Sequence, residues 1–159
     1  MTTQHFRIGD SKVLESREVS DGKTIRRRRE TLDGTRRFTT YERIEKPSLA
    51  VIKKNGSREL FDREKLATAI KQSVGKFFKS EIELERLIDH IEDAVYALGE
   101  SEVESRTIGN VVLDKLAEKN EVAYVRFASV YDDFKTLDEF ESILKSRREQ
   151  REMNEEATT

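Results

Sequence analysis

The sequence predicts an α+β protein in which a small antiparallel β ribbon precedes a mainly helical domain that opens with a β-hairpin. In the first 46 residues, short β-branched or aromatic runs alternate with turn dipeptides, a pattern typical of antiparallel strands. After residue 61 the hydrophobic period changes from two to about three and a half, which indicates amphipathic helices. Pro47, the single proline of the chain, separates the two parts.

Composition limits the class of protein. The 159-residue chain is 39% charged and 35% hydrophobic, so its hydrophobic core must be small. No apolar run approaches the length of a membrane span, so we expect a soluble cytoplasmic protein with no membrane partner. The absence of cysteine excludes disulfides and thiolate metal sites. No nucleophile stands with a base and an orienting partner, so we do not expect an enzyme.

The ribbon module is predicted to occupy residues 1–46 and to contain three strands. Gly9-Asp10, Asp21-Gly22 and Asp33-Gly34 mark its turns. The predicted strands cover residues 12–19, 23–30 and 37–44. Residues 1–47 hold 12 Lys or Arg against 8 Asp or Glu, whereas the remainder holds 18 against 24. Polyanion binding is therefore expected in the N-terminal module.

Arginines are concentrated in this module as a run of four, followed by a pair beyond a predicted turn. Alternation along a strand sends Arg26 and Arg28 to one face and the other two to the opposite face, so one pair is expected to contact DNA. A solvated charged face is the alternative interpretation. The candidate DNA-binding residues are Arg26, Arg27, Arg28, Arg29, Arg36 and Arg37.

The second part begins with a hairpin predicted over residues 49–61, with Asn55-Gly56 as its turn. Asp62 is the predicted N-cap of a helix with the apolar stripe Leu66, Ile70 and Val74. Further helices are predicted from Ser80 to Gly99, from about Ser105 to Asn120, over 122–134, and after a cap at Thr136. The charged residues 145–159 are predicted to be a fraying helix end followed by disorder.

The hairpin and the helix after it suit a polyphosphate. Two adjacent lysines, a tight turn and a helix opened by Asp62 bring cations beside the first free N–H groups of a helix. The same pattern describes many solvent-exposed hairpins, so the residues alone leave both interpretations open. No Gly-x-x-x-x-Gly-Lys-Ser/Thr loop and no carboxylate pair for two metals is present, which favours binding without turnover.

Val51-x-Lys53-Lys54-x-Gly56-x-x-Glu59, followed by Phe61-Asp62-x-x-Lys65-Leu66, resembles the opening of an ATP-cone, the regulatory nucleotide-binding domain of ribonucleotide reductases. The resemblance covers residues 49–140 and implies that the hairpin is a lid over ATP or dATP, bound as a regulatory ligand. The residues it implies are Val51 and Phe61 near the base, Lys53, Lys54 and Lys65 at the phosphates, and Glu59 at the base or ribose.

The segment Val122-Ala-Tyr-Val-Arg-Phe-Ala-Ser-Val-Tyr131 resembles a late helix of the bacterial transcriptional repressors of ribonucleotide reductase genes. Tyr124 and Tyr131 are seven residues apart and therefore share a helix face, whereas Arg126 points elsewhere. Two interpretations stay open for the tyrosines. They are amphipathic core residues, or they stack on or hydrogen-bond to a bound nucleotide.

Lys12-Val-Leu-x-Ser-Arg17, the four arginines with Glu30, and Arg37-Phe-Thr-Thr-Tyr-Glu42 resemble the DNA-binding ribbon of the same repressors. That ribbon normally holds zinc with two Cys-x-x-Cys pairs, and the matching positions here are Thr3 with Phe6 and Thr31 with Gly34. We therefore expect no structural zinc. A metal-free ribbon is predicted instead, stabilised by Phe6, Ile8, Val13, Ile25, Leu32, Phe38 and Tyr41.

The expected function is that of a nucleotide-responsive repressor, a homo-oligomer that binds promoter DNA of ribonucleotide reductase genes under the control of ATP or dATP. The alternative is a nucleotide sensor that acts through a protein partner and has lost specific DNA binding together with zinc. A detached regulatory fragment of a reductase is a third possibility, but it leaves the resemblance of the ribbon unexplained.

Overall fold

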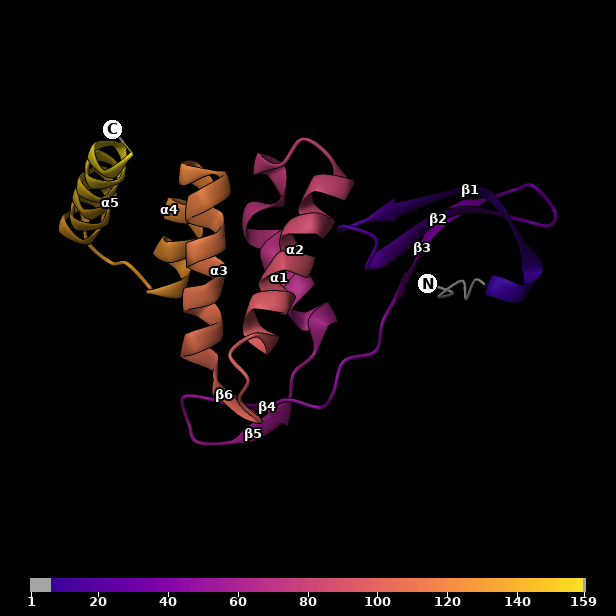
Figure 1. The fold of residues 1–159 in the computed structure, drawn as a ribbon, viewed down its shortest axis with the longest axis horizontal. Coiled ribbons are helices and arrows are strands. Elements are labelled where there is room, and N and C mark those ends of the chain that lie inside the picture. Colours follow the sequence, from indigo (N-terminus) through magenta and orange to yellow (C-terminus); the bar gives the residue numbers. More distant parts are fainter. Residues whose placement is uncertain (1–6, 159) are drawn as a thin grey trace. The chain divides into compact units, whose positions relative to one another are not determined.

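The computed structural model describes residues 7–158. The chain divides into two compact units, and the division falls between Pro47 and Ser48 (Figure 1). The fold is α+β, as predicted: the first unit is built on a β-sheet, and the second combines helices with short strands. The boundary coincides with the proline that separates the two hydrophobic patterns in the sequence.

In the ribbon unit, a short 3₁₀ turn, η1 (Ile8–Asp10), leads into an antiparallel sheet of order β1-β2-β3. Its strands are β1 (Ser11–Val19), β2 (Thr24–Thr31) and β3 (Arg37–Arg43). Every strand end lies within one residue of its predicted position. A bulge between Val13 and Glu15 shifts the β1–β2 register, and such bulges increase the local twist of a strand.

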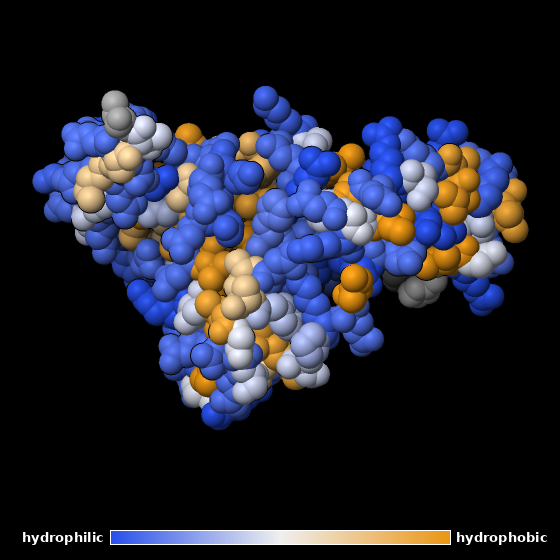
Figure 2. Space-filling view, in the orientation of Figure 1, coloured by the Kyte–Doolittle hydropathy of each residue, from blue (hydrophilic) through white to orange (hydrophobic). Residues whose placement is uncertain are grey.

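The predicted apolar core of the ribbon is wrong for three of its seven residues. Ile8, Val13 and Leu32 are 58%, 45% and 69% exposed, and Phe6 lies outside the described residues. The remaining predicted members, Ile25, Phe38 and Tyr41, are only half-buried. Figure 2 shows hydrophobic residues at the surface of this unit. Because the described part of the unit contains a single sheet and no second layer, apolar side chains on the strands find little within it to pack against.

The second unit opens with the predicted hairpin, formed by β4 (Ala50–Ile52) and β5 (Arg58–Leu60). The turn places Gly56 at a φ of 82°, a conformation that favours glycine. A third strand, β6 (Glu102–Glu104), pairs with β4 in parallel, giving the order β5-β4-β6. Figure 1 shows these strands together at one end of the helices. This strand was not predicted from the sequence, because its three residues include a single apolar side chain, Val103.

The helices of this unit begin near the predicted residues. They are α1 (Arg63–Val74), α2 (Glu81–Tyr96), α3 (Ser105–Lys119), α4 (Glu121–Tyr131) and α5 (Leu137–Ala157), with a 3₁₀ turn, η2 (Gly75–Phe77), after α1. The side chain of Asp62 accepts hydrogen bonds from the N–H groups of Glu64 and Lys65 and so caps α1. Ser80 caps α2, and Thr136 forms a complete capping box with Glu139.

Two apolar clusters hold the second unit together. The larger joins α1, α2, α3 and α4 around residues such as Ile70, Ile88 and Leu116, which are fully buried. The smaller cluster packs the short sheet against the end of α2, and its members are Leu49, Val51, Val95 and Val103. The small sheet is therefore anchored to the helices, and its strand ends are held in fixed positions.

The C-terminal segment corrects one expectation. The sequence predicted a fraying helix end followed by disorder over residues 145–159, whereas α5 continues to Ala157. The guanidinium of Arg147 donates to the Ala117 carbonyl at 2.9 Å, and Arg151 pairs with Glu121 at 3.6 Å. These contacts with α3 and α4, added to a run of strong helix formers, stabilise the helix. No helix in residues 7–158 is long and apolar enough to cross a membrane.

Candidate functional site

The carboxyl ends of β4 and β6 lie side by side, because Ile52 pairs with Glu104 in a parallel register. The chain continues from β4 into Lys53 and Lys54, and from β6 into the first turn of α3. Ligands often bind at the carboxyl ends of adjacent parallel strands. A cavity of about 300 Å³ opens at this edge, lined by Ile52, Lys53, Lys54, Glu104, Ser105 and Arg106.

This cavity, the cationic cavity, is suited to an anion. Within residues 7–158, the side chains of Lys54 and Arg106 form no hydrogen bond or ion pair. The helix that starts here is 15 residues long, and its N-cap residue, Glu104, provides no side-chain cap for the first N–H groups. Two unpaired cations and the positive end of a helix dipole therefore meet at one small cavity. The carboxylate of Glu104 is the acidic group in the lining.

Glu59 connects Lys53 and Lys65, two of the three lysines that are predicted to contact phosphate. One carboxylate oxygen of Glu59 lies 3.2 Å from Nζ of Lys53, and the other lies 3.2 Å from Nζ of Lys65. Hydrogen bonds from Lys53 and then Lys65 hold the pKa of Glu59 below its usual value. Since Glu59 is on β5 and Lys65 is on α1, this bridge ties the hairpin to the first helix.

The residues that the resemblance places near the base belong to the smaller apolar cluster. Val51 is 7% exposed and packs with Leu49 and Val103. Phe61 packs against the same cluster, with its ring edge-to-face to Tyr96 at a centroid distance of 5.8 Å. Both side chains support the hairpin from the core side.

The structure gives the two tyrosines of α4 different surroundings. Tyr124 packs against the larger cluster, and the guanidinium of Arg147 lies 5.4 Å from its ring centroid. Tyr131 stacks on Phe127, and its hydroxyl donates a hydrogen bond of 3.1 Å to the carbonyl of Arg106. Burial raises the pKa of both phenols. Tyr131 thus contacts the helix turn that lines the cationic cavity, whereas Tyr124 lies in the core.

Arg106 was not among the site residues predicted from the sequence. The residue follows β6, the strand that was not predicted, so its position beside the lysine pair could not be inferred from spacing. One local signal was present: a cation in the first turn of a helix opposes the helix dipole and is unfavourable unless another interaction compensates.

In the ribbon, the strand register places Arg26 and Arg28 on one face of the sheet and Arg27 and Arg29 on the other. On the second face, Arg27 pairs with Glu42. Arg29 donates to the hydroxyl of Thr40 at 3.0 Å and to that of Ser11 at 3.2 Å. Those two guanidiniums are therefore partly neutralised or engaged within the sheet.

The face that carries Arg26 and Arg28 is more cationic. By register it also holds Lys12, Arg17, Arg37 and Arg43. Glu30 lies between Lys12 and Arg37, at 3.1 Å from each. Arg36 lies in the turn before β3 and is exposed, and its carbonyl accepts the N–H of Thr31. The structure therefore separates the candidate DNA-binding arginines into two sets with different partners.

Thr31 and Gly34, which match the second Cys-x-x-Cys pair of the zinc-binding ribbons, lie in a turn that is built from hydrogen bonds to Asp33. Its carboxylate accepts the hydroxyl of Thr31 at 2.5 Å, and the N–H and hydroxyl of Thr35 at 3.0 and 2.8 Å. These bonds, with that from Thr31 the largest, lower the pKa of Asp33 to about 2. Gly34 has a φ of 71°. Thr3 and Phe6 lie outside the described residues.

These residues do not fit zinc. The Thr31 hydroxyl is occupied by Asp33, and Gly34 has no side chain to ligate a metal. In the part of the chain that the structure describes, no group of three His, Cys, Asp or Glu residues is placed to hold a metal ion.

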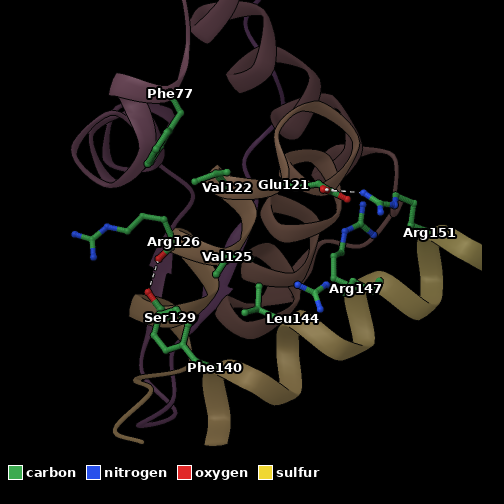
Figure 3. Close-up of a pocket in the computed structure, with 11 residues that line it drawn as sticks. Phe77, Glu121, Val122, Val125, Arg126, Ser129, Phe140, Leu144, Arg147 and Arg151 are labelled. Carbon is green, nitrogen blue, oxygen red and sulfur yellow. Dashed lines mark hydrogen bonds and ion pairs between the residues drawn. The ribbon is translucent and has the colours of Figure 1, made fainter. Parts of the chain in front are cut away.

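A second cavity, of about 630 Å³, lies between α4 and α5 (Figure 3). Val122, Val125 and Arg126 of α4 and Leu144 of α5 are among the residues that line it. None of the residues predicted to bind nucleotide or DNA lines this cavity. Of the residues predicted to bind nucleotide, Lys53 and Lys54 line the cationic cavity instead.

Comparisons with known proteins match both units. The family model described as the ATP cone domain matches residues 49–137, and the one described as the transcriptional repressor NrdR-like N-terminal domain matches residues 7–42. The chain is 50% identical over 135 residues to the transcriptional repressor NrdR of Streptococcus gordonii, covering 85% of this chain and 86% of that protein. It is 49% identical to the NrdR of Streptococcus suis, covering 85% and 83% of the two chains.

Proposed function

We infer that this chain, which belongs to the NrdR family of transcriptional repressors, is a nucleotide-sensing repressor of ribonucleotide reductase genes. The observation that carries the nucleotide assignment is the meeting of Lys53, Lys54 and Arg106 with the uncapped start of α3. The match to the ATP cone domain supports the same assignment. ATP or dATP is proposed as the regulatory ligand, bound without turnover.

In the proposed complex, the phosphates lie between the hairpin and α3. Lys53, Lys54 and Arg106 contact them from the edge of the sheet, and Lys65 reaches them from α1. Val51 and Phe61 support the hairpin on the side of the base. Tyr131 keeps the first turn of α3 in place through the Arg106 carbonyl.

The ribbon is proposed to bind promoter DNA through the face that carries Arg26 and Arg28. On the opposite face Arg27 is paired with the carboxylate of Glu42, whereas Arg28 donates only to the hydroxyl of Thr39, at 3.3 Å, and keeps its net charge, which supports this choice. The domain assignment that follows is a DNA-binding module over residues 1–46 and an ATP-cone over residues 49–140. Guanidiniums would supply affinity for phosphate, and contacts to base edges would supply specificity.

The ribbon is further proposed to bind DNA without zinc. The turn around Asp33 replaces the second Cys-x-x-Cys pair of the zinc-binding ribbons. Metal analysis of the purified full-length protein tests this point. We expect substoichiometric zinc and DNA binding that resists EDTA. One zinc per chain would overturn the proposal.

DNA binding tests the repressor function as a whole. The full-length protein is titrated with a duplex from a ribonucleotide reductase promoter and with a scrambled duplex, at two salt concentrations, with ATP and with dATP. We expect a preference for the promoter that changes with the nucleotide and with the assembly state. Light scattering on the same samples measures the proposed nucleotide-dependent homo-oligomer.

A second candidate function is favoured by the missing zinc ligands: a nucleotide sensor that acts through a protein partner. It predicts equal and salt-labile binding to both duplexes, or no binding, while nucleotide binding is retained. A wild-type protein that does not bind nucleotide would contradict both functions.

A further inference from the structure

The cavity between α4 and α5 combines an apolar wall with cationic side chains (Figure 3). Its volume of about 630 Å³ is in the range of small-molecule sites, which are mostly apolar with a few polar groups. None of its lining residues lines the cationic cavity, so the two are separate sites. The apolar lining residues come from η2, α4 and α5, and they are Phe77, Val122, Val125, Phe140 and Leu144.

Four arginines line the same cavity, and within residues 7–158 only one of them pairs with an acid. Arg151 lies 3.6 Å from Glu121, the acidic residue of the lining. Arg147 donates to the Ala117 carbonyl at 2.9 Å and to the amide oxygen of Gln150 at 3.2 Å. Because both of those acceptors are neutral, the charge of Arg147 is not balanced by a partner.

The remaining two arginines of the lining are Arg126 and Arg148. Their side chains form no hydrogen bond or ion pair in the part of the chain that the structure describes. These unbalanced cations belong to a portion of the sequence, residues 48–159, that holds 18 Lys or Arg against 24 Asp or Glu. Cations without acid partners beside an apolar cavity favour a ligand that has both an anionic and an apolar part.

We propose that this cavity binds a single-chain amphiphile with an anionic head, of the fatty-acid class. The hydrocarbon chain packs on the apolar wall, and the carboxylate accepts hydrogen bonds from the arginines. A nucleotide suits this lining less well, because a base and a ribose carry several polar groups that need partners when they are buried. Among the described lining residues, Ser129 is the only neutral side chain that can hydrogen-bond, and its hydroxyl already donates to the Arg126 carbonyl at 2.8 Å.

Titration calorimetry on the full-length protein tests the site with laurate, below its critical micelle concentration, as the probe. 1-Dodecanol supplies the same chain without the charge, and acetate supplies the charge without the chain. We expect one laurate per chain, and binding of the other two that is at least about tenfold weaker, because each lacks one half of the interaction. ATP should not displace laurate, since the two cavities share no residue. Laurate that binds no more tightly than dodecanol, or that ATP displaces, would overturn the proposal.

Arg148→Gln tests the role of the unpaired cations without breaking an interaction within residues 7–158. It should weaken laurate binding about three- to tenfold and leave dodecanol binding unchanged. Lys145→Gln is the matched control, because Lys145 has the same charge on the same helix and does not line the cavity. Equal laurate affinities for the two variants would contradict the assignment of the carboxylate to the arginines.

Val122→Asp tests the apolar wall by placing a carboxylate in it. Val122 is 63% exposed and lies in the first turn of α4, where an acid suits the helix dipole, so the fold should tolerate the change. We expect laurate binding to weaken by more than about tenfold. Val130→Asp is the matched control, because Val130 is 55% exposed on the same helix and does not line the cavity. Laurate binding by Val122→Asp that equals that of the control would overturn the proposal.

Two further measurements separate this site from other uses of the same surface. Wild-type protein that sediments with phosphatidylglycerol vesicles but does not bind free laurate would assign the cavity to a lipid surface. Light scattering compares the oligomeric state of the wild type with that of Val122→Asp. A wild-type oligomer that Val122→Asp dissociates, together with no laurate binding, would assign the cavity to a second copy of the chain. Either result would overturn the proposal.

Discussion

The hydroxyl of Tyr131 donates a hydrogen bond to the backbone carbonyl of Arg106, at 3.1 Å, and so ties the end of α4 to the first turn of α3. The same ring lies against Gly109, about one helical turn further along α3. Arg106 lines the cationic cavity, so this contact connects the helical core to the proposed phosphate site. A side chain outside the cavity thereby fixes the position of a group inside it.

Tyr131→Phe removes that hydrogen bond while keeping the ring. We expect the free energy of unfolding to fall by about 0.5–1.5 kcal/mol, the usual range for one intramolecular hydrogen bond. Tyr124→Phe is the control, because the Tyr124 hydroxyl forms no hydrogen bond within residues 7–158. Urea denaturation measures both variants. Equal stabilities for the two would show that the Tyr131 hydroxyl contributes nothing.

Gly109→Ala tests the close approach of Tyr131 to α3. A Cβ on Gly109 would lie 2.1 Å from Cζ of Tyr131, so the ring would have to move away. We expect the free energy of unfolding to fall by about 1–3 kcal/mol from overpacking, although alanine is otherwise the better helix former. Gly75→Ala is the control, since its nearest neighbour would be Leu84 at 3.7 Å. A Gly109→Ala protein as stable as the wild type would contradict the packing.

Arg63 forms the centre of a buried charge cluster between α1 and α2. Its guanidinium lies 3.1 Å from Glu85, 2.6 Å from Asp89 and 3.0 Å from Glu92, and its side chain is 14% exposed. Burial would raise the pKa of Glu85, but hydrogen bonds from Lys71 and Arg63 outweigh it and lower that pKa. Glu85 therefore stays charged and needs its cationic partners.

Arg63→Ala should destabilise the protein by about 3–5 kcal/mol, because it removes the cation that three buried carboxylates share. Arg58→Ala removes an exposed ion pair with Glu102 and should cost less than about 1 kcal/mol. Thermal and urea unfolding compare the two. Similar losses of stability for both variants would show that burial does not set the strength of the Arg63 cluster.

Local signals explain what the sequence predicted well. Turn dipeptides located the ribbon strands, and the caps at Asp62, Ser80 and Thr136 located three helix starts, since each depends on residues close in sequence. β6 and Arg106 were not predicted because a three-residue strand is defined by its distant partner, β4. The ribbon core was predicted wrongly because hydrophobicity indicates which residues tend to be buried, but not whether a second layer exists to cover them.

The same distinction applies to the candidate site. Lys53 and Lys54 could be selected as an adjacent pair beside a predicted turn, and Lys65 through the resemblance to the ATP-cone. The structure brings Lys53 to the cavity beside Lys54. The bridging position of Glu59 could not be selected in this way, because it depends on how β5 lies against α1. Which side chains form an ion pair depends on the folded structure, whereas residue type can be read from the sequence.

The two faces of the ribbon sheet should differ in DNA binding. Replacing Arg26 and Arg28 together by alanine should weaken binding to every duplex and lower the slope of log K against log salt by about one for each phosphate that is no longer neutralised. The matched variant replaces Arg27 and Arg29, whose side chains pair within the sheet, and should change the slope less. A larger effect from the Arg27 and Arg29 variant would assign DNA to the opposite face.

Acid should open the turn around Asp33, which replaces the second Cys-x-x-Cys pair of the zinc-binding ribbons. The folded pKa of Asp33, about 2, lies below the ordinary value of 3.8, so the carboxylate stabilises the turn fully above pH 3.8. That contribution is lost as the pH falls from about 4 toward 2. Amide hydrogen exchange at Thr35, whose N–H donates to Asp33, should accelerate over this window beyond the intrinsic trend. In Asp33→Ala, the same amide should be unprotected at every pH, and zinc should not restore protection. Protection of Thr35 that persists in Asp33→Ala would show that the turn is held by other contacts.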